Sequence, residues 1–515
     1  MFCNTQVTFD TSVNNARSEC AIVLNPRNPS NIVGASKRFT NPHSYEFSLS
    51  AYASFDGGVS WLEAAPFGIQ PGWAGISDPT LAWDKAGNVW LAGLAFGPGL
   101  NAPLIGIAMY KSADGGKTWS TPNLIHQSPG DDKQWAAGDS HPASPHYGNV
   151  YVAWDDLSAG VCAFARSTDN GATWTGTAGH GPGSAIGFNS FAPQISVAGD
   201  GTVYVTWVAG SNIMFVKSTD GGASFSAPVA AVSGITPLTS PPLLAPGGFI
   251  ELPGGSFRVL TIPACAAGAG GAFVVAWADY REGVSRIYYG YSHDYGATWA
   301  NAPTGQPLLT GGLASSPDQH DFHPQVAALP NGHIGCAFYE FGPKWSGGPR
   351  LIDVYLAQST NNGAAFSSRQ RVTDRAWDPT VDAPWSHGDP STTFIGDYFG
   401  LDGSANGFSV FWTDTRTGVQ EMFYGAEMRE GPWFGVQWTD TMPPHATIDY
   451  YTWNWPACWD VLWTPMSDTP TGGGPQMSWE VKVERSPYFI TYHIFITNLT
   501  SAPLRVEGRY AILAV

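Results

Sequence analysis

The sequence is poor in charged residues and poorest in basic ones. Asp, Glu, Lys and Arg make up 13% of the 515 residues, and 24 Lys and Arg stand against 41 Asp and Glu, a formal net charge of −17. Binding through nucleic-acid phosphates needs clustered Lys and Arg that release counterions. We therefore expect no nucleic-acid partner.

Long apolar runs are also missing. No window approaches the roughly 20 apolar residues that a membrane helix needs, so we expect no membrane insertion. The start, Met1-Phe2-Cys3-Asn4, lacks the basic and apolar regions of a signal peptide. The chain is then either a mature form or leaves the cell by another route.

Metal-ligating residues are too scattered for a metal centre. No cysteines have CxxC spacing, and the only close histidine pair, His320 and His323, supplies two ligands where three or four are needed. We expect neither a cofactor nor a catalytic metal. A calcium ion bound by loop carboxylates stays open.

The six cysteines are also too few for a fold that is stabilised mainly by disulfides. Cys162 and Cys336 lie in strand-like runs and are expected to be buried free thiols. Cys3 could form a disulfide with Cys20, although pairing cannot be read from the sequence.

Glycine, proline and aromatic residues are plentiful. The chain has 61 Gly and 40 Pro, and Phe, Trp and Tyr make up 13% of it. This composition is typical of many short strands joined by tight turns.

An eight-residue pattern, Ser-x-Asp-x-Gly-x-Ser/Thr-Trp/Phe, recurs six times. The carboxylate can accept backbone N–H bonds across a hairpin turn, the Gly permits positive φ, and the aromatic can pack under a neighbouring strand. A catalytic carboxylate would not be needed six times, so we interpret these aspartates as structural. The pattern is centred on Asp56, Asp114, Asp169, Asp220, Asp294 and, in a degenerate copy, Asn361.

This pattern resembles the Asp-box, or BNR repeat, of sialidases and related β-propellers, over about residues 20 to 425. In that family the box joins the third and fourth strands of a blade, away from the active site. The resemblance implies an all-β fold and agrees with the structural interpretation of the box aspartates.

A second pattern precedes most boxes: a proline-containing start, a turn, and a strand that ends in an aromatic. Counting both patterns gives seven units. The commonest sialidase domain has six blades, so six stays an alternative to about seven four-stranded blades. The units span roughly 20–70, 76–120, 131–176, 191–227, 245–301, 321–368 and 392–428.

The repeat stops near residue 440, and alternating strands follow a Trp-rich stretch. We predict a propeller over residues 1–440 and a small β-sandwich-like domain over 441–515, which serves attachment or assembly.

Propellers usually bind ligands at the mouth of the central channel, where the connections into the inner strands converge. Residues that begin or follow the expected inner strands are therefore candidates. They are Arg38, Asp78, Asp132, Lys133, His141, Asp279, Arg281, His323, Glu340, Asp397, Tyr398, Asp414 and Arg416.

Sialidases hold the substrate carboxylate with three arginines and use a tyrosine nucleophile, a glutamate that activates it and an aspartate acid/base. The resemblance implies Asp78 as acid/base, Tyr398 as nucleophile and Glu340 as its activator. The family's F/Y-R-I-P motif is absent, and Lys37-Arg38-Phe39 is the nearest match.

Three arginines could complete the substrate-binding set: Arg38, Arg281 and Arg416. The last two lie in Trp-x-Asp-x-Arg sequences, for which a structural Asp–Arg ion pair is the alternative interpretation.

Tryptophans in loops rich in Gly and Pro are candidate platforms for a sugar ring. Packing between blades is the alternative interpretation for each. The candidates are Trp73, Trp135, Trp345, Trp377 and Trp385, of which Trp73 and Trp135 are expected to contact substrate.

The sequence thus predicts an extracellular or cell-surface, glycan-directed propeller, and an exo-acting glycoside hydrolase of the sialidase kind is one interpretation. The alternative is a non-catalytic glycan-binding or structural subunit. In either case the C-terminal β domain could bind a protein partner or mediate self-assembly.

Overall fold

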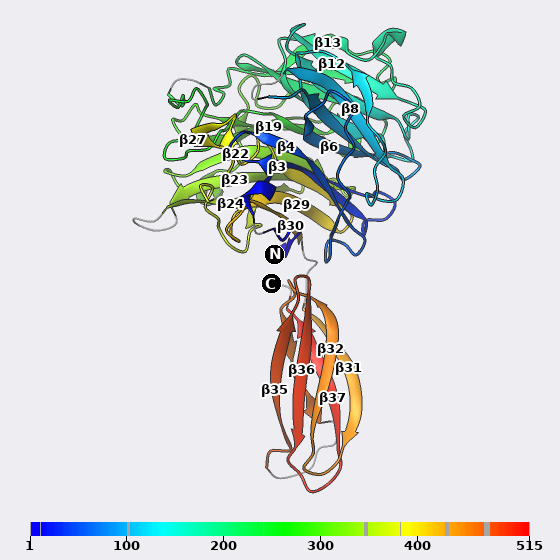
Figure 1. Ribbon diagram of the computed structural model, residues 1–515, viewed down its shortest axis with the longest axis vertical. Coiled ribbons are helices and arrows are strands. Elements are labelled where there is room, and N and C mark those ends of the chain that lie inside the picture. The colour runs from blue at the N-terminus through cyan, green and yellow to red at the C-terminus, as the bar shows by residue number, and fades with distance from the viewer. Residues whose placement is uncertain are drawn as a thin grey trace. The chain divides into compact units, whose positions relative to one another are not determined.

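The computed structural model describes residues 2–10, 12–99, 103–239, 242–343, 349–381, 383–427, 432–467 and 474–513. The chain divides into two compact units, Val7–Gly425 and Met1–Gln6 with Ala426–Val515. Regular structure in the described residues is almost entirely β (Figure 1). Short 3₁₀ turns are the exception: η1 (Val13–Asn15), η2 (Thr177–Gly179), η3 (Ala269–Gly271) and η4 (Gly311–Leu313).

Seven four-stranded antiparallel sheets follow one another along most of the chain. This number agrees with the seven repeat units of the sequence. The first three sheets are β2 (Arg17–Leu24), β3 (Ile32–Asn41), β4 (Glu46–Ser54) and β5 (Leu62–Glu63); β6 (Gly75–Trp83), β7 (Val89–Phe96), β8 (Leu104–Ser112) and β9 (Asn123–His126); and β10 (Asp131–Gly138), β11 (Val150–Asp156), β12 (Val161–Ser167) and β13 (Ser184–Phe188).

The next three sheets are built in the same order. They are β14 (Phe191–Val197), β15 (Val203–Ala209), β16 (Asn212–Ser218) and β17 (Val229–Ser233); β18 (Ala264–Ala267), β19 (Phe273–Asp279), β20 (Arg286–Ser292) and β21 (Gln306–Pro307); and β22 (His320–Ala328), β23 (Ile334–Pro343), β24 (Arg350–Ser359) and β25 (Ser368–Arg371).

The seventh sheet takes its outermost strand from the N-terminus. Its order is β28 (Gly400–Ser404), β29 (Gly407–Asp414), β30 (Glu421–Glu427) and β1 (Phe2–Gln6). A ring of sheets leaves only short, protected edges, which is how an all-β chain of this size avoids edge pairing.

Apolar side chains on both faces of each sheet hold neighbouring blades together. One buried cluster joins Trp90 and Leu94 of the second blade to Val152 and Trp154 of the third. The inner strand β6 is buried along its whole length. Since both faces of a blade pack against neighbours, the strands read as nearly continuous apolar runs.

The box turns share one geometry. In the turn at Asp220, the carboxylate accepts the Ser224 backbone N–H at 2.9 Å and the hydroxyls of Ser218 and Ser224 at 2.8 and 2.6 Å. The box aromatic then packs on the preceding blade, as Trp299 does on Phe215 with ring centroids 5.3 Å apart. Each box therefore closes a hairpin and locks two blades.

The C-terminal unit contains two facing sheets. One has the order β31-β37-β33, with β34 also paired to β37, and the other has the order β32-β36-β35. Since β31 lies in this unit, the unit begins before residue 440, at which the repeat pattern ends. The strands are β31 (Trp433–Met442), β32 (Thr447–Pro456), β33 (Val461–Trp463), β34 (Met466–Ser467), β35 (Met477–Arg485), β36 (Phe489–Asn498) and β37 (Leu504–Ile512).

A disulfide joins Cys3 to Cys458. The pairing of Cys3 with Cys20 considered from the sequence is therefore wrong: Cys20 is a buried free thiol whose Sγ lies against the carbonyl of Phe411. Cys162 and Cys336 are buried and free, as their strand context predicts. Among the helices of the described residues, none is long and apolar enough to cross a membrane.

Candidate functional site

The inner strands of five blades carry a β-bulge near their start. The pairing register shifts between Ser18 and Cys20, and at four equivalent places in β6, β10, β14 and β22. A bulge turns a side chain away from its regular direction, and bulges are frequent beside active sites. The bulge residues, all with positive φ, are Glu19, Asp78, Lys133, Ala192 and His323.

Three of these bulge residues meet in a buried ion cluster. The Lys133 ammonium lies 3.7 Å from Glu19, 3.6 Å from Asp78 and 2.5 Å from Asp397. The Lys37 ammonium, from β3, lies 2.5 Å from Glu19 and 3.4 Å from Asp78. Ion pairs thus connect residues of the first, second, third and seventh blades.

The cluster continues to Arg258, which lies in the long connection between the fourth and fifth blades. Its guanidinium binds Asp397 in a bidentate manner, with Nε at 3.0 Å and Nη2 at 2.7 Å from the two carboxylate oxygens. It also lies 4.6 Å from the centre of the Phe394 ring. A planar fork of this kind both fixes the carboxylate and keeps it ionised.

The environment pushes the carboxyl pKa values in the cluster apart. Burial and the neighbouring Asp78 raise the pKa of Glu19 to about 8. Burial would raise the pKa of Asp78 as well, but Lys133 and Lys37 hold it below its usual range. Burial also opposes ionisation of Asp397, yet Arg258 and Lys133 hold its pKa well below the ordinary value. Burial, with Asp78 adding to it, raises the pKa of Asp132.

A pocket of about 410 Å³ opens above this cluster, at the start of the inner strands. We call it the mouth pocket. Its wall includes both charged groups and aromatic rings. Its lining includes Lys37, Tyr45, Asp78, Phe96, Asp132, Lys133, Phe191, Phe249, Arg258, His387 and Asp397.

Two long connections bring side chains to the mouth pocket. The hairpin of β26 (Trp385–Ser386) and β27 (Asp389–Thr393) carries His387, which stacks on Tyr45 at 4.5 Å and on Phe249 at 5.4 Å. Thr393 pairs with Phe257, so the hairpin and the connection that supplies Arg258 support each other. Burial lowers the pKa of His387 to about 4, so its imidazole is neutral at pH 7.

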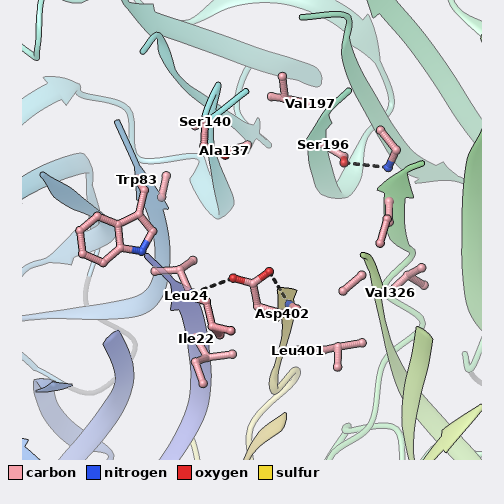
Figure 2. A pocket seen from close by; sticks show the side chains of 18 of the residues that line it. Ile22, Leu24, Trp83, Ala137, Ser140, Ser196, Val197, Val326, Leu401 and Asp402 are labelled. Carbon is pink, nitrogen blue, oxygen red and sulfur yellow. Dashed lines mark hydrogen bonds between the residues drawn. The ribbon is translucent and has the colours of Figure 1, made fainter. Parts of the chain in front are cut away.

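The other end of the inner strands lines a separate cavity of about 670 Å³, the channel cavity (Figure 2). Its wall combines apolar side chains, such as those of Ile22, Leu24, Val326 and Leu401, with polar ones, such as those of Ser140 and Ser196. Asp402 is the only carboxylate among the described residues that line it, and it accepts the Leu24 N–H at 2.7 Å. A lone carboxyl cannot supply an acid/base pair, so the mouth pocket is the better candidate of these two cavities for acid/base chemistry.

The structure brings two of the three predicted catalytic residues together. The Tyr398 hydroxyl donates to the carbonyl of Pro79, next to Asp78, at 3.2 Å. Burial raises the pKa of Tyr398 well above its usual value, and the negative charge of Asp78 adds to this. Glu340 lies elsewhere, in β23, where it pairs with Arg369 and accepts the Gln319 amide at 2.8 Å.

The three predicted substrate-binding arginines are held by other side chains. Arg38 donates to the Asn15 side chain at 2.7 and 3.0 Å. Arg281 pairs with Asp279 at 2.5 Å, and Arg416 pairs with Asp414 at 2.6 Å. In both Trp-x-Asp-x-Arg sequences the aspartate also accepts the tryptophan indole N–H, so each motif forms an ion pair within its own blade.

The predicted tryptophan platforms have mixed surroundings. Trp135 packs edge-on against Tyr398, with centroids 5.4 Å apart, and lines the channel cavity. Trp73 packs against the core between the first two blades, and Trp377 is buried. Trp385 stacks on His43 at 4.3 Å, while Trp345 lies outside the described residues.

One group of described residues could offer three metal ligands: His126, Asp131 and Asp156, whose ligand atoms lie within 4.8 Å of one another. Each already has protein partners. His126 Nδ1 lies 2.8 Å from Asp131, the Trp154 indole donates to Asp131, and backbone N–H groups donate to Asp156. The hydrogen bonds account for the cluster without an ion.

Sequence reasoning missed Glu19, Lys37, Tyr45, Arg258 and His387. Glu19 could have been found, because Ser18-Glu19 and Ser77-Asp78 repeat a Ser-acid pair at equivalent positions. Lys37 was passed over for its neighbour Arg38, but alternation along β3 turns Lys37, not Arg38, toward the cluster. Arg258 and His387 lie in connections that carry no repeat.

No family model matches the chain, and no curated protein matches it. Several solved structures are similar. A protein of unknown function from Dyadobacter fermentans is 14% identical over 69% of this chain and 97% of that one, with a TM-score of 0.45. The intramolecular trans-sialidase from Ruminococcus gnavus is 14% identical over 65% and 92%, with a TM-score of 0.43.

A third similar structure is the Trypanosoma rangeli sialidase, 10% identical over 99% of this chain and 94% of that one, with a TM-score of 0.42. At such identities the chemistry of a site has to follow from this chain's own residues.

Proposed function

We propose that the mouth pocket binds an acidic glycan and hydrolyses a glycosidic bond. The observation that carries the proposal is a pair of carboxyls in one pocket, Asp78 and Asp132, whose pKa values are displaced in opposite directions. Glycoside hydrolysis needs one carboxyl that keeps its proton and one that stays ionised.

The displaced pKa values assign the two roles. Asp132, whose pKa is raised, protonates the leaving-group oxygen as general acid. Asp78, held ionised by Lys133 and Lys37, serves as the base or nucleophile. This assignment reverses the acid/base role that the sialidase resemblance implies for Asp78. Tyr398 is left as a supporting side chain, since its raised pKa disfavours the phenolate that a nucleophile requires.

Charge and shape favour an acidic sugar. Three cations, Lys37, Lys133 and Arg258, line the pocket with two carboxylates that are held ionised, Asp78 and Asp397. With Asp132 protonated in its proposed role as general acid, the pocket lining has one cation more than its ionised carboxylates, and this charge would attract a substrate carboxylate. Aromatic walls such as Phe249 offer flat apolar faces for the ring.

The test is turnover of a panel of fluorogenic glycosides, including sialic-acid and uronic-acid ones, by the wild-type protein and by Asp132→Asn. Loss of a general acid should lower kcat by about 10²–10⁴-fold on substrates with poor leaving groups and by less on activated ones. The alkaline limb of the pH–rate profile should also disappear in the variant.

Asp200→Asn is the matched control. Asp200 is exposed and accepts the Thr202 N–H through Oδ1, an acceptor that asparagine keeps. It should retain full activity. Absence of turnover on every acidic glycoside, or equal activity of Asp132→Asn and the wild type, would contradict the hydrolase.

Non-catalytic glycan binding is the second candidate, and one observation favours it. Tyr451 and Trp453 are 61% and 60% exposed, and their ring centroids are 5.7 Å apart on one face of β32. Such a pair is a ready platform for sugar rings. Glycan-array binding that Tyr451→Ala and Trp453→Ala abolish, without turnover by the wild type, would select this function.

An extracellular or cell-surface setting goes with either function. The Cys3–Cys458 disulfide supports it, because structural disulfides persist mainly in oxidising compartments.

A further inference from the structure

Among the described residues, β35 has a paired strand on one side only. It lies at the end of the sheet β32-β36-β35, beside β36 (Figure 1). It pairs with β36 over nine successive residues, Met477 to Arg485, without a register shift. Neither a proline nor a bulge interrupts it, and those are the usual devices that keep an edge strand from pairing with another chain.

The side of β35 that faces the sandwich interior is apolar and uncovered. Trp479, Val481 and Val483 stand opposite Ile496, Ile494 and Tyr492 of β36, which belong to the buried core. Directly paired residues share one face of a sheet. Yet Trp479, Val481 and Val483 are 47%, 36% and 55% exposed. The core face therefore extends past the region that the second sheet covers.

The other side of β35 carries alternating charge. Glu480, Lys482 and Glu484 lie on the outer face, and the Glu480 and Lys482 side chains are 66% and 59% exposed. A strand with an apolar row on one face and an acid-base-acid row on the other can pair with an identical antiparallel strand so that both faces match.

We propose that β35 pairs with β35 of a second copy of this chain, antiparallel and centred on Val481. In that register Glu480 of each copy stands opposite Lys482 of the other, and Trp479 stands opposite Val483. Both faces match at once, and the two three-stranded sheets become one six-stranded sheet.

The neighbouring register is excluded by charge. A pairing centred on Lys482 places Lys482 opposite itself and Glu480 opposite Glu484, so every outer contact joins like charges. Like charges directly opposite one another destabilise a sheet. A one-residue slip also exchanges the two faces of one strand relative to the other. The charge pattern of β35 therefore favours this register over its neighbour and favours a second copy of β35 as the partner.

The experiment measures the mass of the full chain in solution by analytical ultracentrifugation. The wild type should be a dimer at about 100 µM, a concentration at which even a micromolar interface is occupied. Glu480→Lys and Lys482→Glu should each raise the dimer dissociation constant about tenfold or more, because each reversal creates two like-charge pairs.

The decisive measurement is the mass of a mixture of the two variants. Glu480→Lys offers lysine at both positions and Lys482→Glu offers glutamate at both, so a 1:1 mixture should form heterodimers at concentrations at which each variant alone is mostly monomeric. The double variant Glu480→Lys/Lys482→Glu should dimerise like the wild type. Both side chains are exposed, so the variants should keep the wild-type melting temperature.

Lys85→Glu, an exposed lysine in the propeller, controls for the change in net charge and should leave the dimer intact. A wild-type protein that remains monomeric at the highest concentration would overturn the proposal. So would a mixture of the two variants that remains monomeric, or a dimer that neither charge reversal weakens.

Discussion

At the residue scale, backbone strain and buried charge meet at the same positions. Glu19, Asp78 and Lys133 have φ of +47°, +53° and +50° at the bulges of three inner strands. Positive φ costs a non-glycine residue of order 1–3 kcal/mol. The ion pairs that these residues make with one another offset this cost, since each bulge aims its side chain into the shared cluster.

Lys133 is the residue on which the cluster depends most. It is the one ammonium within ion-pair distance of Glu19, Asp78 and Asp397 among the described residues. Removing it leaves the buried acidic groups to Lys37 and Arg258 alone, and breaking a buried ion pair typically costs about 3–5 kcal/mol. We expect Lys133→Met to lower the free energy of unfolding by this amount in urea denaturation.

Lys111→Met is the control for Lys133→Met. The Lys111 ammonium lies over the Trp90 ring and donates to a backbone carbonyl at an exposed position. Its removal should cost less than about 1 kcal/mol. Equal losses in the two variants would mean that the buried ion cluster does not stabilise the propeller.

The sequence predicted part of this site. Asp78, Asp132, Lys133, His323 and Asp397 were identified from their places at the starts of inner strands, and all lie in or beside the cluster. The roles of individual residues did not follow, because they depend on partners that converge from other blades.

At the element scale, the box turns repeat one hydrogen-bond pattern with one instructive departure. In five copies the carboxylate accepts a backbone N–H and a hydroxyl from the residue four positions on, as in Asp56 with Ser60. In the sixth copy Asn361 accepts the Ala365 N–H at 3.0 Å, and alanine supplies no hydroxyl. The turn geometry survives with fewer bonds.

This difference predicts unequal costs of mutation. Asp220→Ala removes the acceptor of three bonds and should lower the free energy of unfolding by about 1–3 kcal/mol. Asn361→Ala removes the acceptor of bonds from Ser359 and Ala365 and should cost less. Thermal denaturation compares the two, and the proposed glycoside hydrolysis should be unchanged. Loss of activity in Asp220→Ala at full stability would contradict a structural role for the box.

At the scale of the whole molecule, buried acids set the response to pH. Burial raises the pKa of Asp155 and of Glu421 to about 7, and burial with Asp78 raises that of Glu19 to about 8. A carboxyl with a raised pKa binds its proton more tightly in the folded state. Its stabilising contribution is complete below the unfolded pKa and is lost as the pH rises through the folded value.

We therefore expect the melting temperature to fall between about pH 6.5 and 8.5. Glu19 alone should contribute roughly 2 kcal/mol across this window, which corresponds to a few degrees. The pKa values of Asp78 and His323 are lowered, so these two groups change the stability mainly below pH 6.5, outside this window. Differential scanning calorimetry should show a shallower slope for Glu19→Gln. A melting temperature that rises with pH would refute the assignment.

The disulfide gives a second prediction at this scale. Non-reducing peptide mapping should recover a peptide in which Cys3 is linked to Cys458. Cys20, Cys162 and Cys336 are buried and should react with alkylating reagents only after unfolding. Recovery of a Cys3–Cys20 peptide would contradict the structure.

The sequence by itself determined the local elements: the box turns and the alternation of strands, with a count of about seven repeat units that left six open. These follow from local chemistry, because a box turn or a strand needs only neighbouring residues to form. The tertiary structure alone decided which charges meet. Glu19, Asp78, Arg258 and Asp397 lie far apart in the chain, and their pKa values, their pairing and the uncovered face of β35 exist only once separate segments pack together.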